Sequence, residues 1–151
     1  KLVEIGNSGP GFSRHYVYYR EKFRRQPVGR LVPKPYCDRE VVTCIYPNLL
    51  IVAATDSTVW ACIEPIDVGK ILLRYGVLQH VAYRSEPNYR EIIQEQIDLT
   101  EQFNAEDKVI LESIFKGVSA PDARASILCP LERTLLDFAH YYAAAMSTEI
   151  I

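Results

Sequence analysis

The chain has 151 residues, of which 48% are hydrophobic and 24% charged, and its formal net charge at pH 7 is −2. This composition is typical of one packed globular domain and gives no electrostatic case for a nucleic-acid partner. The longest uncharged run, Val41 to Thr55, is interrupted by Pro47 and is shorter than the ~20 apolar residues of a membrane-spanning helix. We therefore expect neither nucleic-acid binding nor a membrane segment.

The cysteines suggest a reducing compartment. The chain contains Cys37, Cys44, Cys62 and Cys129. No two of them form a C-x-x-C pair, and no histidine lies at zinc-finger spacing from them. A domain of this size buries its own core without disulfides, so we expect reduced, mostly buried thiols and a cytoplasmic protein. The chain begins at Lys1 rather than Met, and its first residues read like mid-domain sequence, so we expect a piece of a longer polypeptide.

Residues 1–38 form an irregular Gly/Pro-rich and Tyr/Arg-rich segment. The loop Gly6 to Phe12 has neither the dinucleotide nor the P-loop glycine spacing. The stretch Phe12 to Phe23 is predicted as a short helix or an exposed strand. A basic run is interleaved with aromatic residues, which indicates a solvated surface or a subunit contact: Arg20, Lys22, Arg24, Arg25, Arg30 and Lys34.

Residues 39–84 read as strands joined by short turns. The predicted strands are Val41 to Tyr46, Leu49 to Ala54, Val59 to Ile63 and Lys70 to Arg84, with turns at Thr55 to Ser57 and Glu64 to Gly69. His80 is expected on the more polar face of the last strand. Because short turns join neighbouring strands, the sheet should be antiparallel.

The remainder has helical periodicity. One helix is predicted over Tyr89 to Phe103, and a second is predicted from an Asn104 N-cap to a Gly117 stop, with Glu106 and Asp107 in its first turn. Pro130 opens the last helix, whose predicted apolar stripe is Leu131, Leu135, Phe138, Tyr142 and Met146. The fold class is therefore α+β: a curved antiparallel sheet packed against C-terminal helices, a helix-grip arrangement like that of START and Bet v 1 domains.

Three segments carry a family resemblance: "YPNLLIV" at 46–52, "NAEDKVILESIFKGVSA" at 104–120 and "LERTLLDFAHYY" at 131–142. Their order and spacing resemble the C-terminal half of the catalytic α-subunit of Rieske non-haem iron ring-hydroxylating oxygenases. The resemblance covers residues 39–151, which we interpret as the C-terminal portion of an oxygenase catalytic domain.

The resemblance implies a metal role for Asp107. Mononuclear Fe(II) in this family is held by two histidines and one aspartate, and Asp107 matches the aspartate. The family's histidine pair and the Cys and His motifs of its 2Fe-2S Rieske cluster do not occur among His15, His80, His140 and the cysteines. We expect those groups outside this chain and the isolated chain to be inactive. The alternative is a solvated acidic pair in a first helical turn, where the helix dipole favours it.

The resemblance also implies an apolar substrate pocket beside the metal. Phe103, Ile110 and Leu111 lie nearest the face of Asp107 if the helix continues through Asn104, and Ile97 is a wall further back. The sheet side is either Leu49, Ile51 and Ala53 or their neighbours Leu50, Val52 and Ala54. Ordinary core packing is the alternative interpretation for these residues.

The implied activity is O₂-dependent hydroxylation of an aromatic or other apolar substrate. Implied partners are a ferredoxin or reductase and further copies of the subunit in a trimer, with the segment Arg14 to Lys34 as a candidate interface. One alternative is a free-standing helix-grip domain that binds an apolar ligand without metal. Another is a scaffold subunit with a filled interior.

Overall fold

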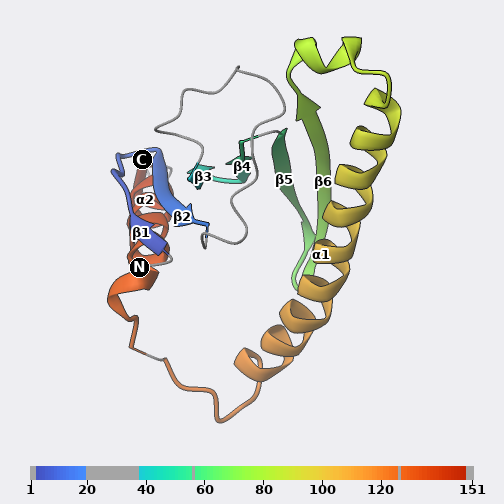
Figure 1. The fold of residues 1–151 in the computed structure, drawn as a ribbon. Helices are drawn as coiled ribbons and strands as arrows, with labels where there is room; N and C mark the ends of the chain where they lie inside the picture. Colours follow the sequence, from blue (N-terminus) through green and yellow to red (C-terminus); the bar gives the residue numbers. More distant parts are fainter. Residues whose placement is uncertain (1–2, 20–37, 56, 126, 149–151) are drawn as a thin grey trace.

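The computed structural model describes residues 3–19, 38–55, 57–125 and 127–148. Within them, one six-stranded antiparallel sheet has the strand order of the sequence, so each strand pairs with its neighbours along the chain (Figure 1). The strands are β1 (Val3–Ile5), β2 (Phe12–Tyr18), β3 (Arg39–Ile45), β4 (Leu49–Ala53), β5 (Ser57–Asp67) and β6 (Lys70–Gln79). The predicted α+β class and antiparallel sheet are confirmed.

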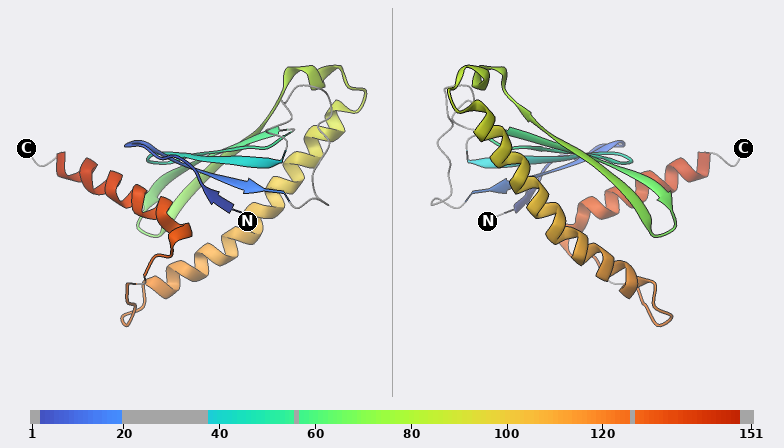
Figure 2. Two further views of the ribbon diagram at one scale, coloured as in Figure 1. Left: turned by 60° about the vertical axis from the view of Figure 1, so that its left-hand side comes forward. Right: turned by 90° about the vertical axis from the view of Figure 1, so that its right-hand side faces the viewer.

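The helices follow the sheet in the sequence. They are the 3₁₀ turn η3 (Val81–Ser85), the long helix α1 (Tyr89–Val118), the 3₁₀ turn η4 (Pro130–Glu132) and α2 (Arg133–Thr148). Figure 2 shows α1 running obliquely along the β5–β6 hairpin, with its C-terminal end beyond the body of the sheet, while α2 lies at the end formed by β1 and β2. No helix in the described ranges is both long and apolar enough to cross a lipid bilayer.

Strand alternation places both helices on the same face of the sheet. Ser57 pairs with Gln79 in the β5–β6 ladder, and its side chain contacts α1. Val59, two residues on, lies opposite Val52 of β4, and the ladders continue this face to Cys44 of β3 and Ser13 of β2, the strand against which α2 packs. We call this the helix face. The opposite face carries Arg14, Thr43, Ile51, Trp60 and Gly76.

Two strand boundaries differ from the prediction. The predicted turn at Glu64 to Gly69 is mostly strand, because β5 continues to Asp67 and the hairpin closes at Val68 and Gly69. The predicted strand to Arg84 ends at Gln79. There the His80 side chain accepts a hydrogen bond from the Ala82 backbone N–H at 3.2 Å and caps η3, so His80 does not lie on a strand face.

The prediction of two helices divided at Asn104 was wrong, because α1 is one helix of 30 residues. Asn104 lies inside it, and Glu106 and Asp107 are in its middle rather than in a first turn. No Pro or Gly occurs between Tyr89 and Lys116, so nothing in the sequence stops the helix at that point. Gly117 belongs to the last turn, and Ser119 is the C-cap.

Of the predicted apolar stripe of the last helix, Phe138 packs against Tyr46, but most of the other members do not meet the sheet. Leu131, Leu135 and Tyr142 are each more than half exposed, whereas Thr134, Asp137 and Tyr141 are half-buried. The Tyr46 ring, directly after β3, explains why this side of α2 faces the sheet. Its centroid lies 5.3 Å from the Phe138 ring and 5.1 Å from the Tyr141 ring, so aromatic packing selects the side of α2 that meets the sheet.

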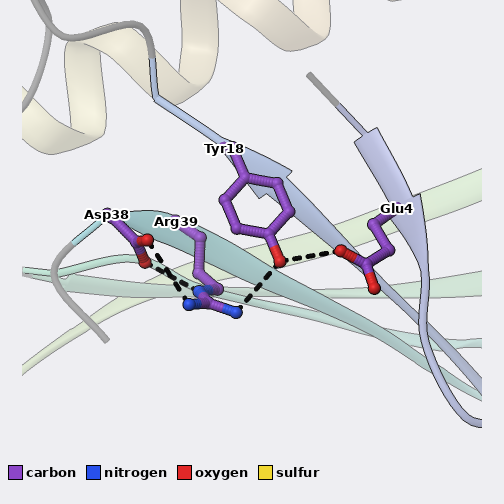
Figure 3. A network of polar contacts seen from close by, with 4 residues as sticks. All are labelled: Glu4, Tyr18, Asp38 and Arg39. Atoms are coloured by element: carbon purple, nitrogen blue, oxygen red, sulfur yellow. Dashed lines mark hydrogen bonds and ion pairs between the residues drawn. The ribbon is translucent and has the colours of Figure 1, made fainter. Parts of the chain in front are cut away.

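On the opposite face a polar network joins the first three strands (Figure 3). Tyr18 Oη donates to Glu4 Oε2 at 2.9 Å and accepts from Arg39 Nη1 at 3.0 Å. Arg39 Nε also donates to Asp38 Oδ1 at 2.7 Å, and its guanidinium lies 4.7 Å from the Tyr18 ring centroid. Charge-assisted hydrogen bonds and the cation–π contact therefore fix the register of β1, β2 and β3.

The first 38 residues contribute to the sheet through β1 and β2, and Phe12 to Tyr18 adopts the strand alternative of the two predicted for that stretch. The basic run from Arg20 to Lys34 and Cys37 lie outside the described residues. The division of the chain at residue 38 stays a prediction.

Tyr19 should ionise at a higher pH than an ordinary tyrosine. Its hydroxyl donates to Glu40 Oε1 at 3.1 Å, and burial together with the Glu40 charge raises the pKa of Tyr19 to about 12. Because unfolded tyrosine ionises near pH 10, the unfolded state loses this proton first, so the stability contributed by protonated Tyr19 falls as pH rises from 10 to 12. Ultraviolet titration of the wild type against Tyr19→Phe measures this. Glu40→Gln should lower the Tyr19 pKa. Ionisation of Tyr19 near pH 10 in the folded wild type would contradict the expectation.

Gly69 should tolerate no side chain. Its φ is +74°, and a methyl group there would come within 2.7 Å of the Phe115 ring of α1. We expect Gly69→Ala to lower the free energy of unfolding in urea by about 1–3 kcal/mol through strain and overpacking. Gly117→Ala is the matched control, since nothing lies within 4 Å of a methyl group there and the residue is helical. The control should be neutral or stabilising by up to ~1 kcal/mol. Equal effects of the two substitutions would refute the Phe115 contact.

Candidate functional site

The candidate site centres on Asp107 in the middle of α1. Its carboxylate is exposed and makes no hydrogen bond or ion pair with the described residues. The neighbouring Glu106 has a partner, since its Oε1 accepts from Gln102 Nε2 at 3.0 Å across one turn of the helix. The two adjacent carboxylates therefore differ: Glu106 is held in a surface pair, while Asp107 has both oxygens available as acceptors.

The β5–β6 hairpin fixes the orientation of Asp107. Near one end of the hairpin, Ser57 Oγ donates to Gln96 Oε1 at 3.1 Å, and at the other end the Phe115 ring covers Gly69. Asp107 follows Gln96 by eleven residues, or about three helical turns and ~16 Å, so the two side chains leave the helix in nearly the same direction. Asp107 therefore belongs to the stripe of α1 that is directed toward the helix face of the sheet.

Asn104 is the polar residue one turn before Asp107 in this stripe. It is half-buried, and its Nδ2 atom is buried without a hydrogen-bond partner in the described part of the chain. A donor without an acceptor and a carboxylate without a donor thus occur three residues apart, which is one helical turn. Along this stripe the polar residues Gln96, Asn104 and Asp107 are followed by the apolar Leu111.

The predicted substrate residues surround Asp107 on the helix surface. The sequence placed these residues beside Asp107 on condition that the helix continues through Asn104, and α1 does so. The residues lie four positions before Asp107 (Phe103), three after it (Ile110) and four after it (Leu111). They are 53%, 57% and 57% exposed, respectively. Ile97, three turns earlier, is half-buried. These large apolar side chains are brought together but are not buried by the described residues, and their role in substrate binding stays a prediction.

The strand register shows which of the two predicted sets of β4 residues lies on the face of the sheet that α1 covers. Leu50 lies opposite Ala61 and Val52 opposite Val59, on the helix face. Leu49 and Ile51 lie on the opposite face. Of the two alternatives, Leu50 and Val52 are therefore the ones on the side of the sheet that α1 covers.

A complete metal site is not formed by the described residues, in which no three His, Cys, Asp or Glu side chains cluster. The Nδ1 atom of His80 is used in capping η3, and His140 lies on α2 at the other end of the sheet. His15 is on β2, where burial lowers its pKa. Asp107 fits one ligand position, because its carboxylate is unpaired and directed toward the helix face, and the other ligands would have to come from beyond the described residues.

Sequence reasoning missed a polar cluster under α2. The oxygen atoms Ser13 Oγ, Tyr46 Oη and Asp137 Oδ2 are all buried without a hydrogen-bond partner in the described part of the chain. Burial raises the pKa of Tyr46, and the Asp137 charge acts in the same direction. Burial also raises the pKa of the Cys44 thiol. The available signal was the spacing of Asp137 and Tyr141, which are four residues apart and therefore share a helix face.

The fold and this stripe define a class of protein: an α+β domain of the helix-grip type, with an apolar helix surface arranged around one unpaired carboxylate. A comparison with protein families gives the family. The model of the ring hydroxylating alpha subunit (catalytic domain) matches residues 6–148, and the chain belongs to that family. The match begins earlier than the resemblance seen in the sequence, which started at Arg39. A search of curated proteins gave no match.

Proposed function

We propose that this chain supplies the carboxylate ligand and part of the substrate wall of a ring-hydroxylating oxygenase that acts on an aromatic or other apolar compound. Family membership supports the oxygenase class. The observation that carries the proposal is the position of Asp107, unpaired on the helix-face stripe and surrounded by Phe103, Ile110 and Leu111.

Asp107 would hold mononuclear Fe(II), with two histidine ligands from outside the described residues. A hard carboxylate oxygen suits Fe(II), and the bound metal would supply O₂ activation next to the substrate. The helix contributes rigidity, because both ends of α1 are fixed on the β5–β6 hairpin and Asp107 lies between the fixed points. The Asn104 amide, one turn away, is available to donate to the carboxylate and orient it.

The apolar side chains around Asp107 would bind the substrate and exclude water. Ile110 and Leu111 lie within one helical turn of the carboxylate, and Leu50 and Val52 lie on the face of the sheet that both helices cover. An apolar substrate would bury the exposed Ile110 and Leu111 side chains and the half-buried strand residues. Electrons would come from a ferredoxin or reductase through a 2Fe-2S Rieske cluster outside this chain, and the family's trimeric assembly is the expected oligomer.

Loss of the Asp107 carboxylate should remove iron. In the whole polypeptide that carries this domain, we expect Asp107→Ala to lower the content of mononuclear iron at least tenfold, because one of three protein ligands is lost. Metal analysis with electron paramagnetic resonance distinguishes this iron from a Rieske cluster. Glu106→Gln is the matched control, since it alters the adjacent, surface-paired carboxylate and should leave the iron content unchanged. Full iron content in Asp107→Ala would instead favour the metal-free, ligand-binding alternative.

Shortening Leu111 should weaken substrate selection. We expect Leu111→Ala to lower kcat/KM for the preferred apolar substrate about tenfold, because a hydrophobic contact beside the reacting carbon is lost. Val109→Ala is the control, as Val109 is 69% exposed and leaves the helix on the side opposite to Asp107. Steady-state kinetics with iron-loaded enzyme measure both variants. Equal losses would show that the Asp107 side of α1 does not line the pocket.

A further inference from the structure

The outer edge of β6 is open in the described part of the chain. β6 is the last strand in the sheet order and pairs on one side only, with β5. Outside that ladder, no backbone hydrogen bond between described residues involves positions 70–79. The α1 helix contacts the hairpin through side chains such as Gln96 and Phe115, while its own peptide groups bond within the helix. Alternate residues of β6 therefore direct their N–H and C=O groups outward, where another extended strand can bond them.

β6 lacks most of the features that keep an edge strand from pairing. Proteins protect such edges with charges, prolines or bulges. The ten residues of β6 include no proline, and their charges are Lys70 and Arg74. Arg74 is already paired, since its Nε atom lies 2.6 Å from Glu64 Oε1. Apolar side chains between 36% and 55% exposed lie on both faces of the strand: Ile71, Leu73 and Tyr75 on the helix face, and Leu72 and Leu78 on the opposite face.

The sequence of β6 is complementary to itself in one antiparallel register. A two-fold axis normal to the sheet at Tyr75 sets this residue opposite its own counterpart and keeps the helix faces of two copies on one side. On the helix face, Leu73 then lies opposite Val77 of the second copy. On the other face, Leu72 lies opposite Leu78. Apolar residues thus meet apolar residues in both rows, which is the favourable case for cross-strand neighbours.

Arg74 selects this register over its neighbour. An axis at Arg74 would set two guanidinium groups opposite each other, which is unfavourable. With the axis at Tyr75, Arg74 lies opposite Gly76 of the second copy. The Trp60 ring covers that glycine, because a methyl group built there would come within 2.8 Å of Trp60 Nε1. Arg74, Gly76 and Trp60 share the face opposite the helices, so the guanidinium of one copy comes beside the indole of the other, a cation–π arrangement.

We propose that the open edge of β6 binds the same edge of a second copy of this chain, in an antiparallel pair with its two-fold axis at Tyr75. The two sheets join into one continuous sheet. The new ladder bonds the outward backbone groups, and the cross-strand pairs bury exposed apolar side chains. The pairing is independent of the oxygenase assignment. If the subunits also form the expected trimer, this contact joins two trimers.

Disulfide trapping in the whole polypeptide that carries this domain tests the register. Tyr75→Cys sets a thiol opposite its counterpart, at the ~4.5–5.5 Å Cα separation of an opposed antiparallel pair, which suits a disulfide. We expect oxidation to give a covalent dimer on a non-reducing gel. Leu73→Cys is the matched control, since its counterpart lies four residues, roughly 13 Å, along the strand and should not cross-link. Both variants carry Cys129→Ser, because Cys129 is exposed, and the Cys129→Ser parent gives the background. Equal cross-linking of the two variants, or none in Tyr75→Cys, overturns the proposal.

Sedimentation velocity tests the association without a new thiol. We expect the mass of the wild-type assembly to double as its concentration rises through the micromolar range. Leu78→Lys sets a charge opposite Leu72 of the second copy and should raise the dissociation constant at least tenfold. Ile66→Lys is the control, because Ile66 is similarly exposed at 54% but belongs to β5, away from the open edge. A wild-type mass that stays constant, or equal effects of the two substitutions, refutes pairing through β6.

Discussion

The arrangement of the candidate site depends on two contacts that hold α1 along the β5–β6 hairpin. The hydrogen bond from Ser57 to Gln96 fixes the N-terminal half of the helix, and the Phe115 ring on Gly69 fixes its C-terminal end. Between these points the helix has no proline or glycine that would let it bend. The direction of Asp107 follows from the rotation of the helix at Gln96 and from helical geometry, although Asp107 itself touches no strand side chain through a hydrogen bond or ion pair in the described structure.

Both helices lie on one face of the sheet, but they use it differently. The α2 helix packs through aromatic rings on the end formed by β1 and β2, and α1 follows the hairpin at the other end. The central strand β4 carries Leu50 and Val52 on this face. Two chemically different regions therefore share one sheet face: an apolar one around a single carboxylate on α1, and a polar one under α2 where Asp137 is largely buried.

The sequence predicted the fold class because strand alternation and short turns are local signals that survive in the structure. It failed at Asn104, where a cap residue followed by Glu106 and Asp107 imitates a helix start. A capping signature is weak when no residue breaks the preceding helix, and the contact of Gln96 with the sheet supports continuity. In α2 the apolar pattern included Phe138 but not Tyr141, because it could not show that the Tyr46 ring would pack against both. The end of β6 was also missed, because the hydrogen bond from the Ala82 N–H to the His80 side chain, which begins η3, is not a feature that strand propensity describes.

Asp107 was proposed as a metal ligand from the resemblance, and that role stays a prediction. The continuous helix places Phe103, Ile110 and Leu111 within about one turn of it. The sequence could not choose between Leu49 and Leu50 for the sheet side, because alternation gives two faces without saying which one a helix covers. The ladder register resolved this choice. Asp137 escaped notice because a single carboxylate in an amphipathic helix ordinarily lies in solvent.

The sequential strand order has a consequence for assembly. Every strand pairs with its immediate predecessor, so the sheet can form hairpin by hairpin. The connections from β3 to β6 are short and cost little entropy to close, whereas residues 19–38 separate β2 from β3. The docking of α2 on β2 spans still more, because it joins segments separated by most of the chain. That long loop can close only after the last helix exists. The packing of α2 on β2 and on the Tyr46 ring should therefore be the latest part of the molecule to take shape and the first to open when the C-terminal end is pulled.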